Sequence, residues 1–325
     1  MSESSNYTLD MSVCDNDKVR LRVKTVVIMR IFAGLGNQQF QLAFGLYLAK
    51  KYNCELKIDT SYFSRRYRPI VQRDVFYEFS LSKIFSLTNF TGNFEKEFIG
   101  LVFYKLLVAR SLRKLFRRLP LLPDILTNQR DFPISTGRRN YIQGYFQNWQ
   151  EIETVRNEML DLYCLKEGLS EGLSALHRQM SSCSSVSVHF RRGDYVSGRK
   201  GVVDTFVELS PGYYREALSV IDSACPIERV YVFSNDHAWV KDNFACDFDV
   251  VFVDCVWGDD ADVIEQYLMK SCRHNVIANS TFSWMAGWLN TNAEKLVCYP
   301  DRWFTDSARK NDIYFPPEWL CIQAE

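Results

Sequence analysis

Two consecutive arginines end a strand-like segment in the run HFRRGDY, residues 189–195. A guanidinium group binds oxyanions through two parallel hydrogen bonds and keeps its charge at any working pH. Ligands of open α/β sheets gather at the carboxyl ends of the strands. We therefore expect Arg191 to bind a diphosphate and to stabilise it as it departs. Arg192 has a second interpretation, in which it pairs with Asp194 and fixes the turn.

A glycine-containing turn, AGLGNQ at residues 33–38, precedes a helix-like segment. Because Gly34 and Gly36 lack Cβ atoms, backbone N–H groups at a helix start could approach a phosphate here. A dinucleotide-binding turn would place a third glycine where this chain has Gln39, although Asp59 stands where such a site would hold a ribose. A tight structural turn explains the glycines equally well.

A second turn of this kind is NSTFSW, residues 279–284. Its hydroxyl groups and the free N–H groups of a helix start again suit an anion. Ser280 or Thr281 is equally suited to be a simple N-cap. Trp284 and Trp288 have the i, i+4 spacing of a buried helix face, and we expect them in the core.

The sequence predicts no metal site. Asp259, Asp260 and Asp262 resemble the D-x-D with which many sugar transferases hold a divalent ion, but a solvated loop with Asp262 as the helix cap is the favoured interpretation. No two of the four histidines have the spacing of metal ligands; they are His177, His189, His237 and His274.

These residues must be positioned by alternating strands and helices, which predict an α/β fold with parallel sheets. Near the N-terminus we expect a strand, a helix and a strand at residues 24–32, 37–51 and 55–59. A second series begins at residue 184, with strands at 184–190, 229–234, 250–253 and 275–278 and helices at 211–222, 237–243, 262–272 and 281–289. Residues 61–140 show no clear period.

Composition limits the classes of protein that this chain could be. The 325 residues carry 39 basic and 39 acidic side chains, so no overall field attracts nucleic acid, and we expect no nucleic-acid partner. Ten scattered cysteines without a C-x-x-C pair indicate reduced thiols and a cytoplasmic protein.

Two segments bear on location. Residues 1–23 are polar, lack the apolar region of a secretion signal, and are predicted to be a disordered leader. No segment reaches the ~20 apolar residues that a membrane-spanning helix needs. Residues 105–118 alternate basic and apolar side chains, which fits either a helix on the protein surface or a peripheral contact with an anionic membrane.

The motifs together resemble the α-1,2-fucosyltransferase family, glycosyltransferase family 11, over about residues 28–303. The family's GGLGNQMFQYAFG appears as AGLGNQQFQLAFG, with Ala33, Gln39 and Leu42 as departures, and its HxRRGDY appears whole. Further blocks are GYFQ at 144–147, FSND at 233–236 and CRHNVIANSTFSWM at 272–285. Glu265 stands where the family often has Asp.

The resemblance implies a GT-B-like fold of two Rossmann-like domains that face a cleft. We expect an N-terminal, acceptor-side domain at residues 24–180 and a C-terminal domain that binds GDP-fucose at residues 181–325. The implied reaction is an inverting, metal-independent transfer of fucose from GDP-β-L-fucose to the 2-hydroxyl of a galactoside in an oligosaccharide or surface polysaccharide. No cofactor is implied beyond this co-substrate.

The resemblance also implies roles for individual residues. Arg191 corresponds to the arginine that grips the diphosphate and stabilises departing GDP. Gly34, Gly36 and Asn37 correspond to a turn that meets fucose and phosphate, and Ser280, Thr281 and Phe282 to a second phosphate-binding turn. Contacts to guanosine are implied for His189, Asp236 and His274, and Asp59 loses its proposed role as a ribose ligand.

Two questions stay open at this point. Asp194 is our candidate for the catalytic base, although holding Arg192 is an equally good role for it. A non-catalytic nucleotide-sugar or glycan-binding protein on the same fold is the alternative function, and a dinucleotide-dependent oxidoreductase is disfavoured by the missing third glycine. The motifs do not specify the acceptor.

Overall fold

The structure is a computed structural model, and it describes residues 24–63, 124–127, 133–165, 168–192, 205–254, 256, 261–306 and 315–324. Five predictions lie outside the described residues: the leader at 1–23, the basic segment at 105–118, Asp194, Asp259 and Asp260. The described residues form two compact units, the first with residues 24–31, 44–63, 124–127 and 133–144, and the second with residues 32–43 and the described residues from 145 onward.

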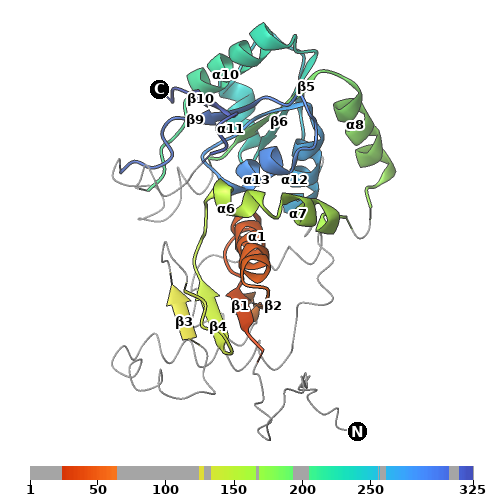
Figure 1. Cartoon of the computed structure of the whole chain (residues 1–325). Coiled ribbons are helices and arrows are strands. Elements are labelled where there is room, and N and C mark those ends of the chain that lie inside the picture. Colours follow the sequence, from red (N-terminus) through yellow and green to blue (C-terminus); the bar gives the residue numbers. More distant parts are fainter. Residues whose placement is uncertain are drawn as a thin grey trace, which may run out of the picture. The chain divides into compact units, whose positions relative to one another are not determined.

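The first unit contains a four-stranded sheet, in the order β2-β1-β4-β3, in which all neighbours run parallel (Figure 1). Its strands are β1 (Val26–Arg30), β2 (Glu55–Asp59), β3 (Asp124–Thr127) and β4 (Arg139–Gln143), and a 3-10 turn follows β2 at Ser61–Phe63. Inside this unit the hydroxyl of Tyr141 donates to Asp59 Oδ2 over 2.6 Å, and both side chains are buried. Asp59 is therefore a core partner of Tyr141.

The second unit contains a six-stranded, all-parallel sheet in the order β10-β9-β8-β5-β6-β7. The strands are β5 (Ser185–Phe190), β6 (Arg229–Ser234), β7 (Val250–Phe252), β8 (His274–Val276), β9 (Val297–Pro300) and β10 (Leu320–Ile322). The helices are α6 (Trp149–Glu153), α7 (Arg156–Leu162), α8 (Glu171–Ser182), α10 (Pro211–Ala224), α11 (His237–Asn243), α12 (Ala261–Ser271) and α13 (Thr281–Leu289). Helix α1 (Leu35–Lys51) begins in this unit and ends in the first.

Alternating side chains of β6 cover both faces of this sheet. Val230 and Val232 join one apolar cluster with Leu218 of α10, whereas Tyr231 and Phe233 join another with residues of α8 and α12. Figure 1 accordingly shows α10 and α12 on opposite sides of the sheet. Burial of a parallel sheet on both faces is the arrangement of doubly wound α/β proteins. The two parallel sheets with their helices confirm the predicted α/β class.

Residues 145–180 pack with the second unit, although the predicted boundary between domains stands after residue 180. Arg156 of α7 donates to the carbonyls of Trp288 and Asn290 at 3.0 and 2.9 Å, and Glu153 of α6 accepts from the indole N–H of Trp288 at 2.7 Å. These bonds attach α6 and α7 to the C-terminal end of α13. The predicted boundary itself stays a prediction.

The state of the cysteines and the hydropathy of the helices can also be read from the described residues. Eight of the ten cysteines lie among the described residues, and each of these eight is a free thiol. Within the described ranges, no helix combines the length and the apolar character needed to cross a membrane.

Candidate functional site

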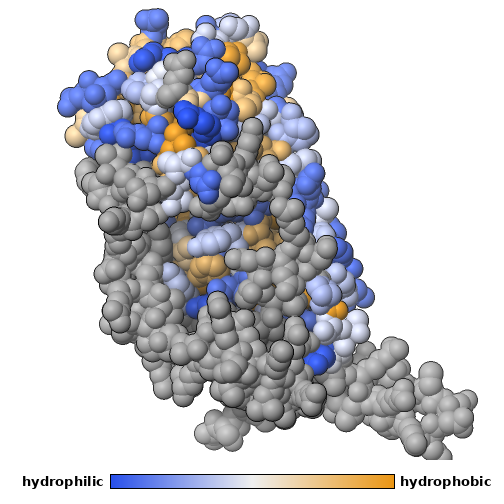
Figure 2. Space-filling model, turned by 90° about the vertical axis from the view of Figure 1, so that its left-hand side faces the viewer, coloured by the Kyte–Doolittle hydropathy of each residue, from blue (hydrophilic) through white to orange (hydrophobic). Residues whose placement is uncertain are grey.

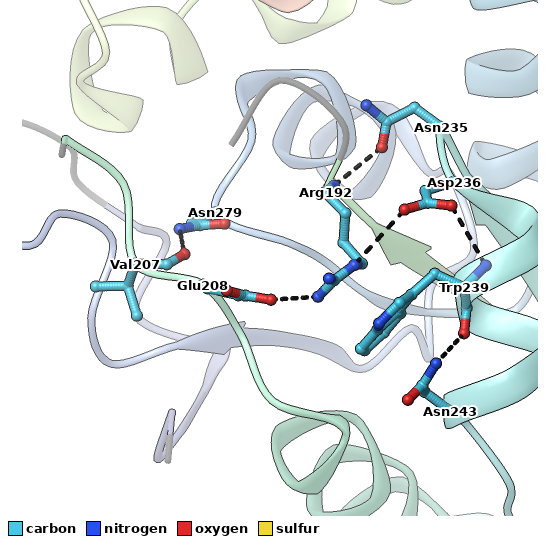
Figure 3. A network of polar contacts seen from close by, with 8 residues as sticks. All are labelled: Arg192, Val207, Glu208, Asn235, Asp236, Trp239, Asn243 and Asn279. Atoms are coloured by element: carbon cyan, nitrogen blue, oxygen red, sulfur yellow. Dashed lines mark hydrogen bonds and ion pairs between the residues drawn. The ribbon is translucent and has the colours of Figure 1, made fainter. Parts of the chain in front are cut away.

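Arg192 follows the end of β5 and is 8% exposed. Figure 3 shows its guanidinium group between Glu208 and Asp236 and against the ring of Trp239, whose centroid lies 3.3 Å from the Arg192 Cζ. It forms an ion pair with Glu208, and its Nε lies 3.9 Å from Asp236 Oδ2. Its backbone N–H donates to Asn235 Oδ1 at 2.9 Å. Arg192 thus fastens the end of β5 to the end of β6.

Arg191 is half-buried and directly precedes this anchored residue. Its charge acts on the neighbouring His189 and, after desolvation, is the second cause that lowers the pKa of that imidazole to about 3. His189 is 4% exposed, and its ring lies 5.4 Å from the ring of Phe282. Because a pKa of about 3 keeps His189 neutral at physiological pH, its contribution to a site is that of a neutral ring.

The two predicted anion turns meet within the second unit. A Cβ atom on Gly36 would lie 2.3 Å from the carbonyl carbon of Thr281 and 2.5 Å from the backbone nitrogen of Phe282. Only glycine permits this approach of two backbones. The first turn of α1 therefore lies directly on the first turn of α13, so that the positive ends of two helices come together.

Ser280 is the N-cap of α13, because its Oγ accepts from the Phe282 N–H at 3.4 Å. The structural interpretation of this residue is thus confirmed. Since β8 pairs with β5, with Val276 beside Val188, the chain that leads from β8 to Ser280 lies beside the end of β5. Arg191, His189, Gly36, Thr281 and Phe282 belong to one edge of the sheet.

The turn before α1 is held by the helix's own glutamines. Gln38 Nε2 donates to the Ala33 carbonyl at 2.8 Å, and Gln41 Oε1 accepts from the Phe32 N–H at 2.9 Å. Ala33 adopts a φ of 66°, the left-handed region, where the family motif has glycine. Gly34 lies within this turn, and Asn37 Oδ1 accepts from Gln147 Nε2 at 2.9 Å.

A buried pair of side-chain amides lies next to the start of α13. Gln39 and Gln266 of α12 are both fully buried and exchange hydrogen bonds of 2.6 and 2.9 Å. Gln266 Nε2 also donates to the Phe282 carbonyl at 3.0 Å. The residue that replaces the family's methionine, Gln39, is therefore part of a network that joins α1, α12 and α13.

The three residues with predicted guanosine contacts lie in different places. His189 and Asp236 lie at the carboxyl ends of β5 and β6. Asp236 is the N-cap of α11 and accepts from the Trp239 N–H at 3.3 Å, while its side chain remains 38% exposed. His274 begins β8 and pairs with Val186, so it lies at the opposite, amino end of the sheet. The expected contact of His274 with guanosine therefore stays a prediction, and the structure places this residue one short strand away from the Ser280 turn.

His274 has a structural role at this end of the sheet. It is 1% exposed, and its Nδ1 accepts from the Leu296 N–H at 3.0 Å. Desolvation and the charge of Arg273 lower its pKa to about 4. A polar cavity of about 460 Å³ also lies at this amino end, and its lining, which includes Ser184, Glu228 and Lys270, contains none of the predicted site residues.

The acidic residues near α12 differ from the prediction. Asp262 lies inside the first turn of α12 and accepts from the Val263 N–H at 2.8 Å, so it is not the residue that precedes the helix. Among the described residues, no three His, Cys, Asp or Glu side chains are grouped as metal ligands. Burial, with the charge of Asp262, raises the pKa of Glu265 to about 7. Trp284 and Trp288 are buried, as predicted.

Sequence reasoning did not identify several residues of this edge. Gln147 stands in the GYFQ block that carries the family resemblance, and this block was its only signal. No sequence motif marks Glu208 or Trp239, because their importance comes from contacts with Arg192 across the fold.

Comparison with known proteins gives several relatives. The chain is 29% identical to the O-antigen biosynthesis glycosyltransferase WbnK of Escherichia coli, over 83% of this chain and 92% of that protein. It is 24% identical to an alpha-1,2-colitosyltransferase of Escherichia coli, over 92% and 99% of the two chains. It is 30% identical to galactoside alpha-(1,2)-fucosyltransferase 2 of Rattus norvegicus, over 56% of this chain and 53% of that one.

Among solved structures, the fucosyltransferase NodZ from Bradyrhizobium aligns with a TM-score of 0.43 and 14% identity, over 81% of this chain and 92% of that one. The model of glycosyl transferase family 11 matches residues 122–323. This match covers more than half of the chain and includes the HFRRGDY and NSTF motifs, and so the chain is a glycosyltransferase that belongs to glycosyl transferase family 11.

Proposed function

We propose that the protein transfers fucose from GDP-β-L-fucose to the 2-hydroxyl of a terminal β-galactoside, with inversion and without a metal ion. The observation that carries the proposal is the contact of Gly36 with the Thr281–Phe282 peptide, which joins two helix N-termini beside the strand that delivers Arg191. This combination of donors and positive charge suits a sugar diphosphate.

In the proposed reaction the bond between the anomeric carbon and the β-phosphate oxygen breaks, and its electron pair leaves with GDP. The acceptor 2-hydroxyl attacks the opposite face of the same carbon, which converts the β-linked donor into an α-1,2 product. Arg191 and the two helix ends stabilise the charge that develops on GDP, the work that a divalent cation would otherwise do. The hydroxyl proton passes to a base, for which Asp194 remains our candidate.

The names of the relatives support the choice of substrates. A galactoside fucosyltransferase relative favours fucose and galactose, and an O-antigen glycosyltransferase relative favours an acceptor in a surface polysaccharide. The colitosyltransferase relative makes GDP-colitose the second candidate donor.

The first experiment measures GDP release from GDP-fucose and, separately, from GDP-colitose, with EDTA present, over acceptors with and without a terminal β-galactose. Galactoside-dependent release from GDP-fucose is the expected result. Release that EDTA abolishes would contradict metal independence, and binding of GDP without turnover of any acceptor would favour the non-catalytic alternative.

Adjacent arginines provide matched variants for this assay. Arg191→Lys should lower kcat by about 10²-fold or more with an unchanged Tm, because a single ammonium cannot replace the bidentate guanidinium at a developing charge. Arg192→Lys should instead lower Tm, because lysine cannot contact Glu208 and Asp236 while it stacks on Trp239. Substantial activity in Arg191→Ala would contradict the role of Arg191.

A further inference from the structure

We propose that Gln147 is a positioning residue that turns the side-chain amide of Asn37 so that its two N–H donors face the diphosphate. The inference rests on the proposed function, and it assigns to Gln147 a role in binding the donor nucleotide. The observation that carries it is the 2.9 Å hydrogen bond from Gln147 Nε2 to Asn37 Oδ1.

The backbone of Asn37 is fixed in place. Asn37 is the third residue of α1 and directly follows Gly36, whose Cα lies against the Thr281–Phe282 peptide. On its other side, Gln39 is anchored to Gln266. Only the side-chain torsions of Asn37 remain to decide which amide atom faces outward from this turn.

The backbone around Gln147 is equally constrained. Phe146 adopts a φ of 53°, a left-handed conformation that is strained for a bulky residue. The Asn148 N–H donates to the Phe146 carbonyl at 2.9 Å, which makes Gln147 the centre of a three-residue turn. Asn148 in turn is the N-cap of α6 and accepts from the Gln150 N–H at 3.2 Å. The conformation of Phe146 and the N-cap role of Asn148 therefore fix the backbone of Gln147, and with it the direction in which its side chain leaves the backbone.

An amide has an acceptor oxygen on one side and a donor NH₂ group on the other. When Gln147 donates to Asn37 Oδ1, the Nδ2 of Asn37 faces away from Gln147. It then presents donors at the junction of the two helix N-termini, where the proposed function places phosphate oxygens. If Asn37 were turned over, it would present its carbonyl oxygen to an anion and weaken binding.

The test uses two substitutions of Gln147 with opposite hydrogen-bonding properties. Gln147→Met keeps the size but frees the amide of Asn37, and the KM for GDP-fucose and the Kd for GDP should both rise by about tenfold. Gln147→Glu can only accept at neutral pH, so Asn37 must turn its NH₂ group toward it, and both constants should rise further, by about 10²-fold. In both variants kcat should change by less than about threefold and Tm by less than about 2 °C.

Gln150→Glu is the matched control, because it adds the same charge on an exposed side chain three residues away and should leave KM unchanged. Asn37→Asp tests the same point from the other partner, since an aspartate still accepts from Gln147 but presents an acceptor to the phosphate. It should weaken GDP binding without lowering Tm.

The outcomes separate this inference from the proposed function. If Gln147→Glu binds GDP as well as the wild type, the bond runs in the opposite direction and the inference is overturned, even though transfer continues. If no galactoside is turned over but the Gln147 variants lose GDP affinity as described, the inference stands and the transfer reaction is wrong. A wild type that does not bind GDP would contradict both.

Discussion

Single residues at this edge of the sheet are held in conformations that favour the site over local stability. Ala33 is the clearest example, because its φ of 66° lies in the left-handed region, where a Cβ atom is unfavourable. Hydrogen bonds on both sides, to the Phe32 N–H and to the Ala33 carbonyl, keep the residue there. The glycine that the family has at this position fits the backbone without this strain.

Ala33→Gly should therefore stabilise the protein. Removal of the left-handed strain raises the free energy of unfolding by about 1–2 kcal/mol. The greater freedom of glycine in the unfolded chain lowers it again by about 0.5–1 kcal/mol. We expect a net gain of about 0.5–1 kcal/mol, measured as a higher midpoint of urea unfolding.

Ala49→Gly, in the last turn of α1, is the matched control and should cost up to about 1 kcal/mol, because a helical position has no such strain. If both substitutions lowered the midpoint equally, the left-handed conformation of Ala33 would not be strained in the folded protein.

At the scale of elements, helices α1, α12 and α13 are joined through one buried amide pair. Gln39 and Gln266 satisfy each other, and Gln266 also satisfies the Phe282 carbonyl at the start of α13. A buried amide that loses its partner costs about 1–3 kcal/mol, whereas removal of both amides costs much less.

Gln39→Met, which restores the family's residue, should accordingly destabilise this chain by about 1–3 kcal/mol, since Gln266 Oε1 would keep only the 3.5 Å hydrogen bond from the Tyr163 hydroxyl and Gln266 Nε2 would lose its acceptor on Gln39. The double variant Gln39→Met/Gln266→Leu should recover part of the loss. A double-mutant cycle from urea unfolding measures the coupling, and an additive cycle would show that the pair does not connect the helices.

The elements that sequence alone predicted are those with a clear period and a clear end. The strands at 55–59 and 229–234 and the helices at 237–243 and 281–289 have the predicted bounds, and each ends at a charge, a turn residue or a cap. The missed strand β4 (Arg139–Gln143) has only two apolar side chains and is defined by its pairing with β1. Helix α8 was missed although Leu173, Leu176 and Met180 follow a helical period.

The site was predictable only where a turn carries its own chemistry. Arg191, Gly36 and Thr281 could be named because strand ends and helix starts attract anions in any such fold. The predicted contact of His274 with guanosine came from the motif alone, and in the structure β8 separates His274 from the Ser280 turn of the same motif. Gln147 and Gln266 depend on contacts with α1, more than one hundred residues distant in the chain.

At the scale of the whole molecule, equal numbers of acidic and basic side chains leave no net charge at neutral pH, so general charge repulsion is small near neutrality. Individual buried groups add their own dependence of stability on pH. The pKa of His189 is about 3 and that of His274 about 4 in the folded protein, both below the ordinary 6.5. Glu265 has the opposite shift, to about 7 from an ordinary 4.5.

The sign of each change in stability with pH depends on whether the folded or the unfolded state binds the proton more tightly. Below pH 6.5 the unfolded histidines take up protons that the folded ones refuse, so each removes stability as pH falls, by about 2 kcal/mol at pH 5. Folded Glu265 takes up a proton already near pH 7, before the unfolded form does. Its burial therefore costs about 3 kcal/mol at pH 8, and most of that cost disappears by pH 5.

Unfolding by urea at pH 8 and at pH 5 should separate these contributions, because comparing each variant with itself at the two pH values cancels any fixed cost of the substitution. His189→Gln should lose about 2 kcal/mol less than the wild type on acidification, since the buried imidazole that refuses the proton is gone. Glu265→Gln should be more stable than the wild type at pH 8 and should lose about 2 kcal/mol more on acidification, because the gain from protonating Glu265 is absent. Parallel pH profiles for both variants and the wild type would mean that neither side chain is desolvated in the folded protein. The His189 ring beside Phe282 would then have a pKa close to its ordinary 6.5.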